Sequence, residues 1–146
     1  MRDCLWSHRF TRTLIGLSLV CSIPTAAFAG TISDGQAAYD RGDYAEALRL
    51  FSSAAAQGDP EGQCDLALLY LTGHGVTKDL AQALHWYRLS AEQGNKESQY
   101  AVGFMYENGE GGVAKDPAEA LRWYRLAAAQ GNDDAAEAVD RLTKGK

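Results

Sequence analysis

Apolar residues recur at intervals of three and four along most of this chain, which is the spacing of amphipathic helices. The firmest single example is the stretch Tyr44–Gln57. One face of that helix carries Ala47, Leu50, Phe51 and Ala54. A shorter helix is expected before it at Ser33–Tyr39, although Gly35 weakens that helix by about 1 kcal/mol relative to alanine.

The strongest pattern is a duplication. The stretch AEALRWYRLAAAQGN at Ala118–Asn132 repeats AQALHWYRLSAEQGN at Ala81–Asn95, 37 positions earlier, with eleven of fifteen residues identical. Extended upstream, the two copies start at Glu61 and Lys96, and each predicts two helices joined by a glycine loop. Self-similarity at this period indicates a repeat architecture, in which each unit buries its apolar face only against its neighbours.

Small and aromatic residues mark the face that each unit buries. Ala67 and its counterpart Gly103 are expected where a partner helix comes close. The buried seam of the second helix is predicted at residues spaced by four, namely Ala83, Tyr87 and Ala91 in one copy and Ala120, Tyr124 and Ala128 in the other. Trp86 and Trp123 lie beside this seam and are predicted to pack onto the neighbouring unit.

The helix ends are specified locally. Gly58 is suited to the left-handed residue after a helix, Asp59 to the next N-cap, and Pro60 to the first helical position. The same device is expected at Gly94-Asn95 and Gly131-Asn132, with further caps at Asp79 and Asp116. A last helix is predicted at Asp133–Thr143, with Ala136, Val139 and Leu142 facing inward.

The copied run A-x-x-W-Y-x-x-[SA]-A-x-Q-G-N, together with an upstream [AG]-x-x-Y, resembles the Sel-one-like repeat (SLR) family, relatives of the tetratricopeptide repeat. The resemblance is strong over Glu61–Asn132, and Tyr39–Asp59 resembles a shortened tetratricopeptide-type unit. It implies an all-α fold, a right-handed α/α solenoid of about three helix-turn-helix repeats. The units are expected at 31–58, 59–94 and 95–131, with a capping helix at 132–146. The family also implies a binding scaffold or adaptor.

Residues 1–29 have the pattern of a secretory signal peptide. Arg2, Arg9 and Arg12 precede an apolar run that is shorter than the roughly 20 residues of a membrane-spanning helix. The small residues Ala27 and Ala29 predict cleavage after Ala29 and a periplasmic or secreted product. An uncleaved membrane anchor and lipidation at Cys21 are the alternatives.

Signal removal changes the charge and the cysteine count. It takes three of the 14 basic and one of the 19 acidic residues, so the net charge falls from −5 to −7. An acidic domain is a poor candidate for binding nucleic acid and suits a basic or neutral protein partner better. Cys64 would then be the only cysteine, so we expect no intramolecular disulfide and assign it the role of a small apolar filler.

Residues suited to catalysis or metal binding are few. The loops Gly73–Gly75 and Gly109–Gly112 could cradle an anion but have no P-loop Lys-Ser/Thr, so tight turns explain them. His74 and His85 lack the further ligands of a zinc site. There is no G-x-S-x-G motif and no carboxylate pair. We therefore expect no metal, no cofactor and no enzymatic activity.

The positions that differ between the copies predict a binding surface. They lie on the first helix of each unit, which lines the concave surface in tetratricopeptide relatives. The candidate partner-binding residues are Glu61, Leu68, Leu71, Glu97, Tyr100, Phe104, Glu107 and Asn108. Apolar anchors inside an acidic rim are typical of a binding hot spot. The alternative is that Leu68 and Phe104 simply pack against a neighbouring helix.

The chain is therefore interpreted as a non-catalytic protein–protein interaction scaffold or adaptor of the bacterial cell envelope, which binds a protein or peptide on its concave face. An immunity protein against an exported toxin is an alternative. A small cell-envelope hydrolase is a rival from a different class, and it would need a nucleophile within hydrogen-bond reach of a base. Self-association through the solenoid ends is a third possibility.

Overall fold

The structure is a computed structural model that describes residues 26–144. This part of the chain folds into seven helices and contains no strand. The helices are α1 (Ala26–Asp40), α2 (Tyr44–Ala56), α3 (Pro60–Thr72), α4 (Leu80–Glu92), α5 (Lys96–Asn108), α6 (Pro117–Ala129) and α7 (Asp133–Lys144). The predicted signal peptide lies largely outside the described residues.

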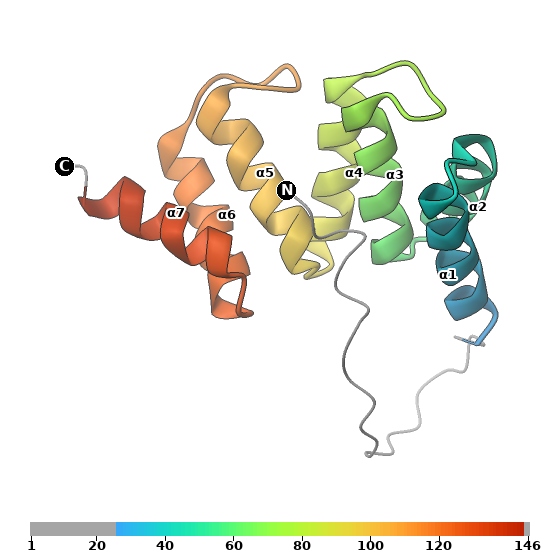
Figure 1. Ribbon diagram of the computed structural model, residues 1–146. Coiled ribbons are helices and arrows are strands. Elements are labelled where there is room, and N and C mark those ends of the chain that lie inside the picture. The colour runs from blue at the N-terminus through green and yellow to red at the C-terminus, as the bar shows by residue number, and fades with distance from the viewer. Residues whose placement is uncertain (1–25, 145–146) are drawn as a thin grey trace, which may run out of the picture.

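The helices form a solenoid. Each packs chiefly against the helix before and the helix after it, and the successive pairs follow one another around an arch (Figure 1). Two contacts join odd-numbered helices: Gln36 of α1 hydrogen-bonds Asp65 of α3, and Arg141 of α7 bonds Glu107 of α5. The odd-numbered helices therefore form one layer and the even-numbered helices the other. The predicted all-α solenoid is confirmed.

The predicted helix caps are present. The side chains of Asp59, Asn95 and Asn132 each accept a backbone hydrogen bond of 2.8 Å from three residues ahead. Asp79 and Asp116 likewise accept bonds from the first turns of α4 and α6. Each cap satisfies amide groups that the first turn of a helix leaves without partners, and so each fixes where a helix begins.

The glycine loops are tight turns, as predicted. Gly73 and Gly109 end α3 and α5 in the left-handed conformation, with φ of 79° and 73°. Gly111 has φ of 71°, and a Cβ built there would lie 2.7 Å from the carbonyl oxygen of Leu80. A side chain at this position would therefore be both strained and in collision with α4, which explains the glycine without a ligand.

Three apolar clusters hold the solenoid together, and each draws on two adjacent units. The first junction joins α1 and α2 to α3 and contains Ile32, Ala38, Ala47, Phe51, Ala54, Ala55, Leu66 and Leu69. The second joins the two copied units and contains Cys64, Ala67, Ala83, Leu84, Tyr87, Ala91, Ala101, Val102, Met105 and Trp123. The third joins the last unit to α7 and contains Ala120, Tyr124, Ala127, Ala135 and Ala138. Among the described residues, each of these clusters draws on more than one unit or on a unit and the capping helix.

The buried seam follows the prediction with one shift. Tyr87 and Tyr124 are 2% and 1% exposed, and a Cβ at Gly103 would lie 2.8 Å from the Tyr124 ring, so the small residue is required there. Ala128 is half-buried, however, and Ala127 takes the fully buried place. Trp123 is buried in the second junction. The half-buried Trp86 packs against both the first and second junctions.

A hydrogen-bonded pair of glutamines, which the sequence analysis did not predict, recurs at two successive units. Gln93 donates to Gln63 at 2.8 Å, and Gln63 donates in turn to the carbonyl oxygen of Ala55 in α2. One unit later, Gln130 donates to Gln99 at 2.8 Å, and Gln99 donates to the carbonyl oxygen of Ala91 at 3.1 Å. We call this arrangement the glutamine relay. It ties the C-terminal end of each copied unit back to the unit before it.

The terminal helices differ from their predicted form. Helix α1 begins at Ala26, well before Ser33, and runs across the predicted cleavage point. Its Gly35 is buried against Phe51, whose ring would lie 2.5 Å from a Cβ, so close packing requires the helix-weakening glycine. In α7 the inward assignment of Ala136 is wrong: Ala136 is exposed, while Ala135 and Ala138 are buried.

Cys64 is 2% exposed and lies in the second junction, which fits the role of an apolar filler. In the full chain, which still carries residues 1–29, Cys64 is disulfide-bonded. The expectation of no intramolecular disulfide concerns the chain after signal removal and stays a prediction. The other two cysteines, Cys4 and Cys21, lie outside the described residues.

The second junction predicts the consequence of losing its largest side chain. Trp123→Ala should lower the free energy of unfolding by about 3–5 kcal/mol, because it opens a cavity between two units that are stable only together. Urea denaturation followed by circular dichroism measures the change. Leu126→Ala, at a side chain of the same helix that is 43% exposed, is the control. A similar loss in both variants would contradict the role given to the junction.

Candidate functional site

The eight predicted partner-binding residues lie on two odd-numbered helices. Glu61, Leu68 and Leu71 are on α3, and the other five are on α5. Glu61 and Asn108 are exposed, and the remaining six are half-buried. We call the exposed side of the odd-numbered helices the odd-helix face.

The aromatic part of the predicted strip is shared with the third junction. Tyr100 and Phe104 pack against that cluster, to which α7 contributes Val139 and Leu142. The Tyr100 ring lies 5.5 Å from the ring of Tyr124, centroid to centroid. These two side chains therefore help to hold the capping helix, and the alternative that Phe104 packs against a neighbouring helix describes their surroundings better.

Glu107, predicted for the rim, instead holds α7 in place. Its carboxylate accepts hydrogen bonds from the Arg141 guanidinium and from the Tyr124 hydroxyl at 2.8 Å. The bonds from Arg141, followed by that from Tyr124, lower the pKa of Glu107 despite its partial burial. The carboxylate therefore stays ionised and its hydrogen-bonding capacity is largely used within the chain.

The open part of the predicted strip lies on α3. Leu71 packs against the second junction, but Leu68 belongs to none of the three junctions, although it is half-buried. Glu61, seven residues before Leu68, lies on the same face of the helix and is exposed. An apolar side chain beside a carboxylate thus remains at the surface of α3.

A buried carboxylate lies next to this surface. Asp65 is 1% exposed, and its Oδ2 atom accepts a hydrogen bond of 3.5 Å from the side-chain amide of Gln36. Its Oδ1 atom is buried and has no hydrogen-bond partner in the described part of the chain. Burial raises the pKa of Asp65 well above its usual value, the Gln36 bond opposes this shift, and the charges of Glu61 and Asp59 add to it.

Sequence reasoning missed Asp65, although a signal was present. The copied unit has Ala101 at the equivalent position, which is also buried. An acidic residue where the copy has an apolar one is a local departure from the repeat pattern. Such departures at buried positions cost stability and are typical of functional sites.

Aromatic rings gather beside this carboxylate. His74 stacks on Tyr44 with ring centroids 4.3 Å apart, and its Nδ1 atom lies 2.9 Å from the Tyr39 hydroxyl. Burial raises the pKa of Tyr39, and Tyr44, Asp40 and Asp65 contribute further. The loop histidine, for which no role was predicted, therefore anchors the α3–α4 loop to α1 and α2.

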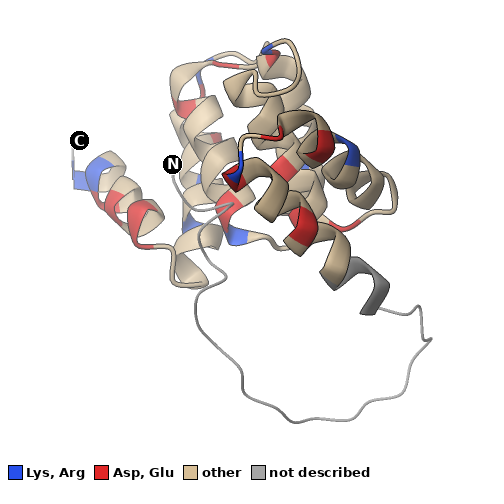
Figure 2. Ribbon diagram, turned by 45° about the vertical axis from the view of Figure 1, so that its right-hand side comes forward, with Lys and Arg blue, Asp and Glu red and all other residues tan. Residues whose placement is uncertain are grey.

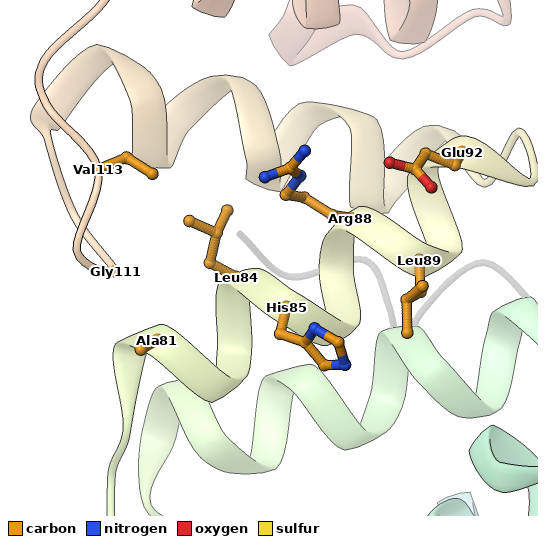
Figure 3. A pocket seen from close by; sticks show the side chains of 8 residues that line it. All are labelled: Ala81, Leu84, His85, Arg88, Leu89, Glu92, Gly111 and Val113. Atoms are coloured by element: carbon orange, nitrogen blue, oxygen red, sulfur yellow. The ribbon is translucent and has the colours of Figure 1, made fainter.

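A hollow lies between α4 and the loop that joins α5 to α6. A pocket of about 350 Å³ is lined by Ala81, Leu84, His85, Arg88, Leu89, Glu92, Gly111 and Val113. Figure 3 shows Leu84 pointing towards Val113, and the charged ends of Arg88 and Glu92 extending from α4. The volume is at the lower end of small-molecule sites, but the polar side chains are exposed, so water screens their charges. We assign no ligand to this pocket.

Acidic and basic residues are intermixed over the solenoid (Figure 2). Basic positions are scattered among the more numerous acidic ones, and several acidic positions lie on the last helix. The view shows no basic stripe of the kind that tracks a phosphate backbone.

The described residues bring together no hydrolase-like arrangement. Within residues 30–144, the hydrogen bond found at a histidine ring joins His74 to Tyr39, not to a serine, threonine or cysteine. The same region contains no group of three or more residues suited to hold a metal ion. Among the described helices none is long and apolar enough to cross a membrane.

The geometry defines an all-α solenoid of two-helix repeats with a capping helix. The family model described as the Sel1 repeat matches residues 30–59, 60–95 and 96–132. The chain belongs to the Sel1 repeat family, as the resemblance predicted. Members of this family are commonly protein–protein interaction scaffolds and generally non-catalytic.

Solved structures agree with this assignment. The chain is 34% identical to c5321, a protective antigen present in uropathogenic Escherichia coli strains that displays an SLR fold, with a TM-score of 0.69 over 76% of this chain and 24% of that one. It is 31% identical to a Sel1 repeat protein from Oxalobacter formigenes, with a TM-score of 0.70 over 80% of this chain and 50% of that one. This chain thus spans half or less of those two proteins.

A third solved structure, cysteine rich protein B of Helicobacter pylori, shares the fold at 18% identity, with a TM-score of 0.60 over 80% of this chain and 97% of that one. The search of curated proteins found no match.

Replacing the buried carboxylate of Asp65 by a neutral side chain should stabilise the protein, by an amount that depends on pH. In the native state the pKa of Asp65 is raised, so its contribution to stability is present below the unfolded-state pKa and is lost as pH rises through the native value. Asp65→Asn should therefore raise the free energy of unfolding at pH 7 by about 1–3 kcal/mol, so that the variant unfolds at a higher urea concentration than wild type. The difference between the two proteins should shrink towards pH 4. Asp34→Asn, at an exposed carboxylate of α1, is the control.

Urea melts at several pH values between 4 and 8 provide the measurement. A destabilised Asp65→Asn at pH 7 would mean that the carboxylate has a stabilising partner, and the interpretation of Asp65 as a costly residue would fail.

Proposed function

We propose that this chain is an exported, non-catalytic scaffold of the bacterial cell envelope that binds a protein or peptide on its odd-helix face. The observation that carries the proposal is Leu68, an apolar side chain that remains at the surface of α3 without joining any junction. Apolar anchors surrounded by polar groups dominate the energetics of protein–protein contacts.

The centre of the proposed surface is the α3 part of the predicted strip. Glu61 is exposed there and Leu68 is half-buried, and Leu71 and Glu97 border them. Tyr100, Phe104 and Glu107 contribute mainly by holding α7, while Asn108 is exposed at the end of α5. The acidic character of the mature chain favours a partner with a basic surface, because complementary charge steers association.

Export is the second part of the proposal. The pattern of residues 1–29 supports it. The resulting location is the periplasm or the exterior.

Leu68→Ser should weaken partner binding by about tenfold or more, through loss of an apolar anchor worth roughly 1.4 kcal/mol, while the melting temperature stays close to that of wild type. The partner is captured from an envelope extract with the exported protein as bait and identified by mass spectrometry. Its affinity is then measured with purified components.

Leu126→Ser is the matched control, because Leu126 is an exposed leucine on the even-numbered layer. An equal loss of binding in both variants, or no loss in Leu68→Ser, would rule out the odd-helix face. Binding that does not weaken with added salt would rule out a basic partner.

If the signal peptide is cleaved after Ala29, the mature chain starts at Gly30. Intact-mass measurement of the exported protein, with and without reductant, tests this directly. Cleavage after Ala29 leaves Cys64 as the single cysteine, so reduction leaves the mass of the monomer unchanged. A longer chain whose mass rises on reduction would show that an N-terminal cysteine is retained in a disulfide, and would contradict cleavage.

A further inference from the structure

We propose that Asp65 receives one cationic side chain, Arg or Lys, of the bound polypeptide. This inference deepens the proposed function and rests on it, because it names the group by which the odd-helix face would select a partner. Three observations carry it: the unmet hydrogen-bonding capacity of the carboxylate, the charge around it, and the way the chain satisfies a comparable carboxylate elsewhere.

The first observation is the incomplete set of hydrogen bonds. A buried carboxylate has about four lone-pair positions to satisfy, yet among the described residues the Asp65 side chain accepts one bond, from Gln36, at the long distance of 3.5 Å. Within residues 30–144 its Oδ1 atom has no partner. A native protein rarely leaves such a group unsatisfied unless the group serves something other than stability.

The second observation is the charge around Asp65. The ionised groups that act on it most strongly are Glu61 and Asp59, which are both negative, and no basic side chain is among them. Tyr87 remains a neutral phenol, since burial, followed by the charge of Asp65, raises its pKa. A cation that reached Asp65 would therefore gain from the negative charges of Asp65, Glu61 and Asp59.

The third observation is an internal template. In the last unit the Glu107 carboxylate accepts a hydrogen bond from the buried Tyr124. The guanidinium group of Arg141 donates two further hydrogen bonds, one to each carboxylate oxygen. The chain therefore already satisfies a carboxylate of the odd-numbered layer with an arginine from the next element of the solenoid. At Asp65, by contrast, the first unit supplies only an amide, from Gln36.

The donor set favours an organic cation over a metal ion. Hard metal ions such as calcium require six or more oxygen ligands, usually from several carboxylates. The described residues offer no group of three suitable side chains. A guanidinium or ammonium group needs only hydrogen-bond acceptors, and one carboxylate with flanking polar groups provides them.

The proposed approach to Asp65 leads past Gln36, whose side chain contacts the carboxylate. Gln36 and Tyr39 are half-buried, so they extend from the interior to the surface of α1. The hydrogen bond from Gln36 to Asp65 is long and hence weak, so an incoming charged donor can replace it at small cost. Displacement of the Gln36 amide is therefore the local signature of binding.

The experiment uses the ¹⁵N-labelled full chain and two small probes, N-acetyl-arginine amide and N-acetyl-citrulline amide, which differ in the positive charge. The arginine probe should shift the side-chain amide signals of Gln36 saturably, and the citrulline probe should not. Asp65→Asn and Asp65→Ala should each weaken binding of the arginine probe by about tenfold or more. Asp65→Ala places at this position the residue that the copied unit has, so the variant is expected to fold.

Glu61→Gln is the control for nonspecific charge attraction. Because Glu61 is exposed, its removal should weaken probe binding by about twofold or less. An equal response to both probes, or a response to the arginine probe that survives in the Asp65 variants, would overturn the proposal. The same shifts with magnesium or calcium chloride would overturn it in favour of an inorganic cation. Absence of probe binding alongside intact Leu68-dependent partner binding would reject the Asp65 receptor while the proposed scaffold function stands.

Discussion

Burial across the boundaries between units is the constraint on which the whole molecule depends. Each junction takes its apolar side chains from two adjacent units, so a two-helix unit alone would leave half of a cluster in water. The close approach that this requires explains two glycines at the boundaries: Gly62 lies against Ala54 of the preceding unit, and Gly111 lies against Leu80 of the preceding unit, where even a methyl group would collide. The glutamine relay then satisfies backbone carbonyl groups at two of the boundaries.

Most of the fold could be predicted from sequence because its determinants are local or periodic. The caps at Asp59, Asn95 and Asn132 are read from two or three adjacent residues, and the units from their own similarity. The misplacement of Ala136 has a physical reason. In a helix rich in alanine, neighbouring small residues carry nearly equal apolar signals, so periodicity alone cannot select the buried one.

The candidate site was less predictable because its residues are defined by contacts between distant segments. Tyr100 and Phe104 have the composition of a binding strip, but α7 packs on them through Val139 and Leu142. The role of Glu107 depends on Arg141, which lies 34 residues away. Nor could the state of Asp65 be read from its own helix, since the hydrogen bond that its side chain accepts within the described residues comes from Gln36, 29 residues earlier. Comparing the two copies shows which positions differ. The structure shows which of those residues already contact other helices of the same chain.

The equivalence of the junctions also bears on how such chains change length. Because the glutamine relay presents the same donor and acceptor at the end of each copied unit, a duplicated unit of 36 or 37 residues inserted between Asn95 and Lys96 would find matching partners on both sides. Growth of this kind conserves both ends of the solenoid while it lengthens the surface between them. This chain and a relative of which it covers only 24% can thus be products of one packing rule, applied a different number of times.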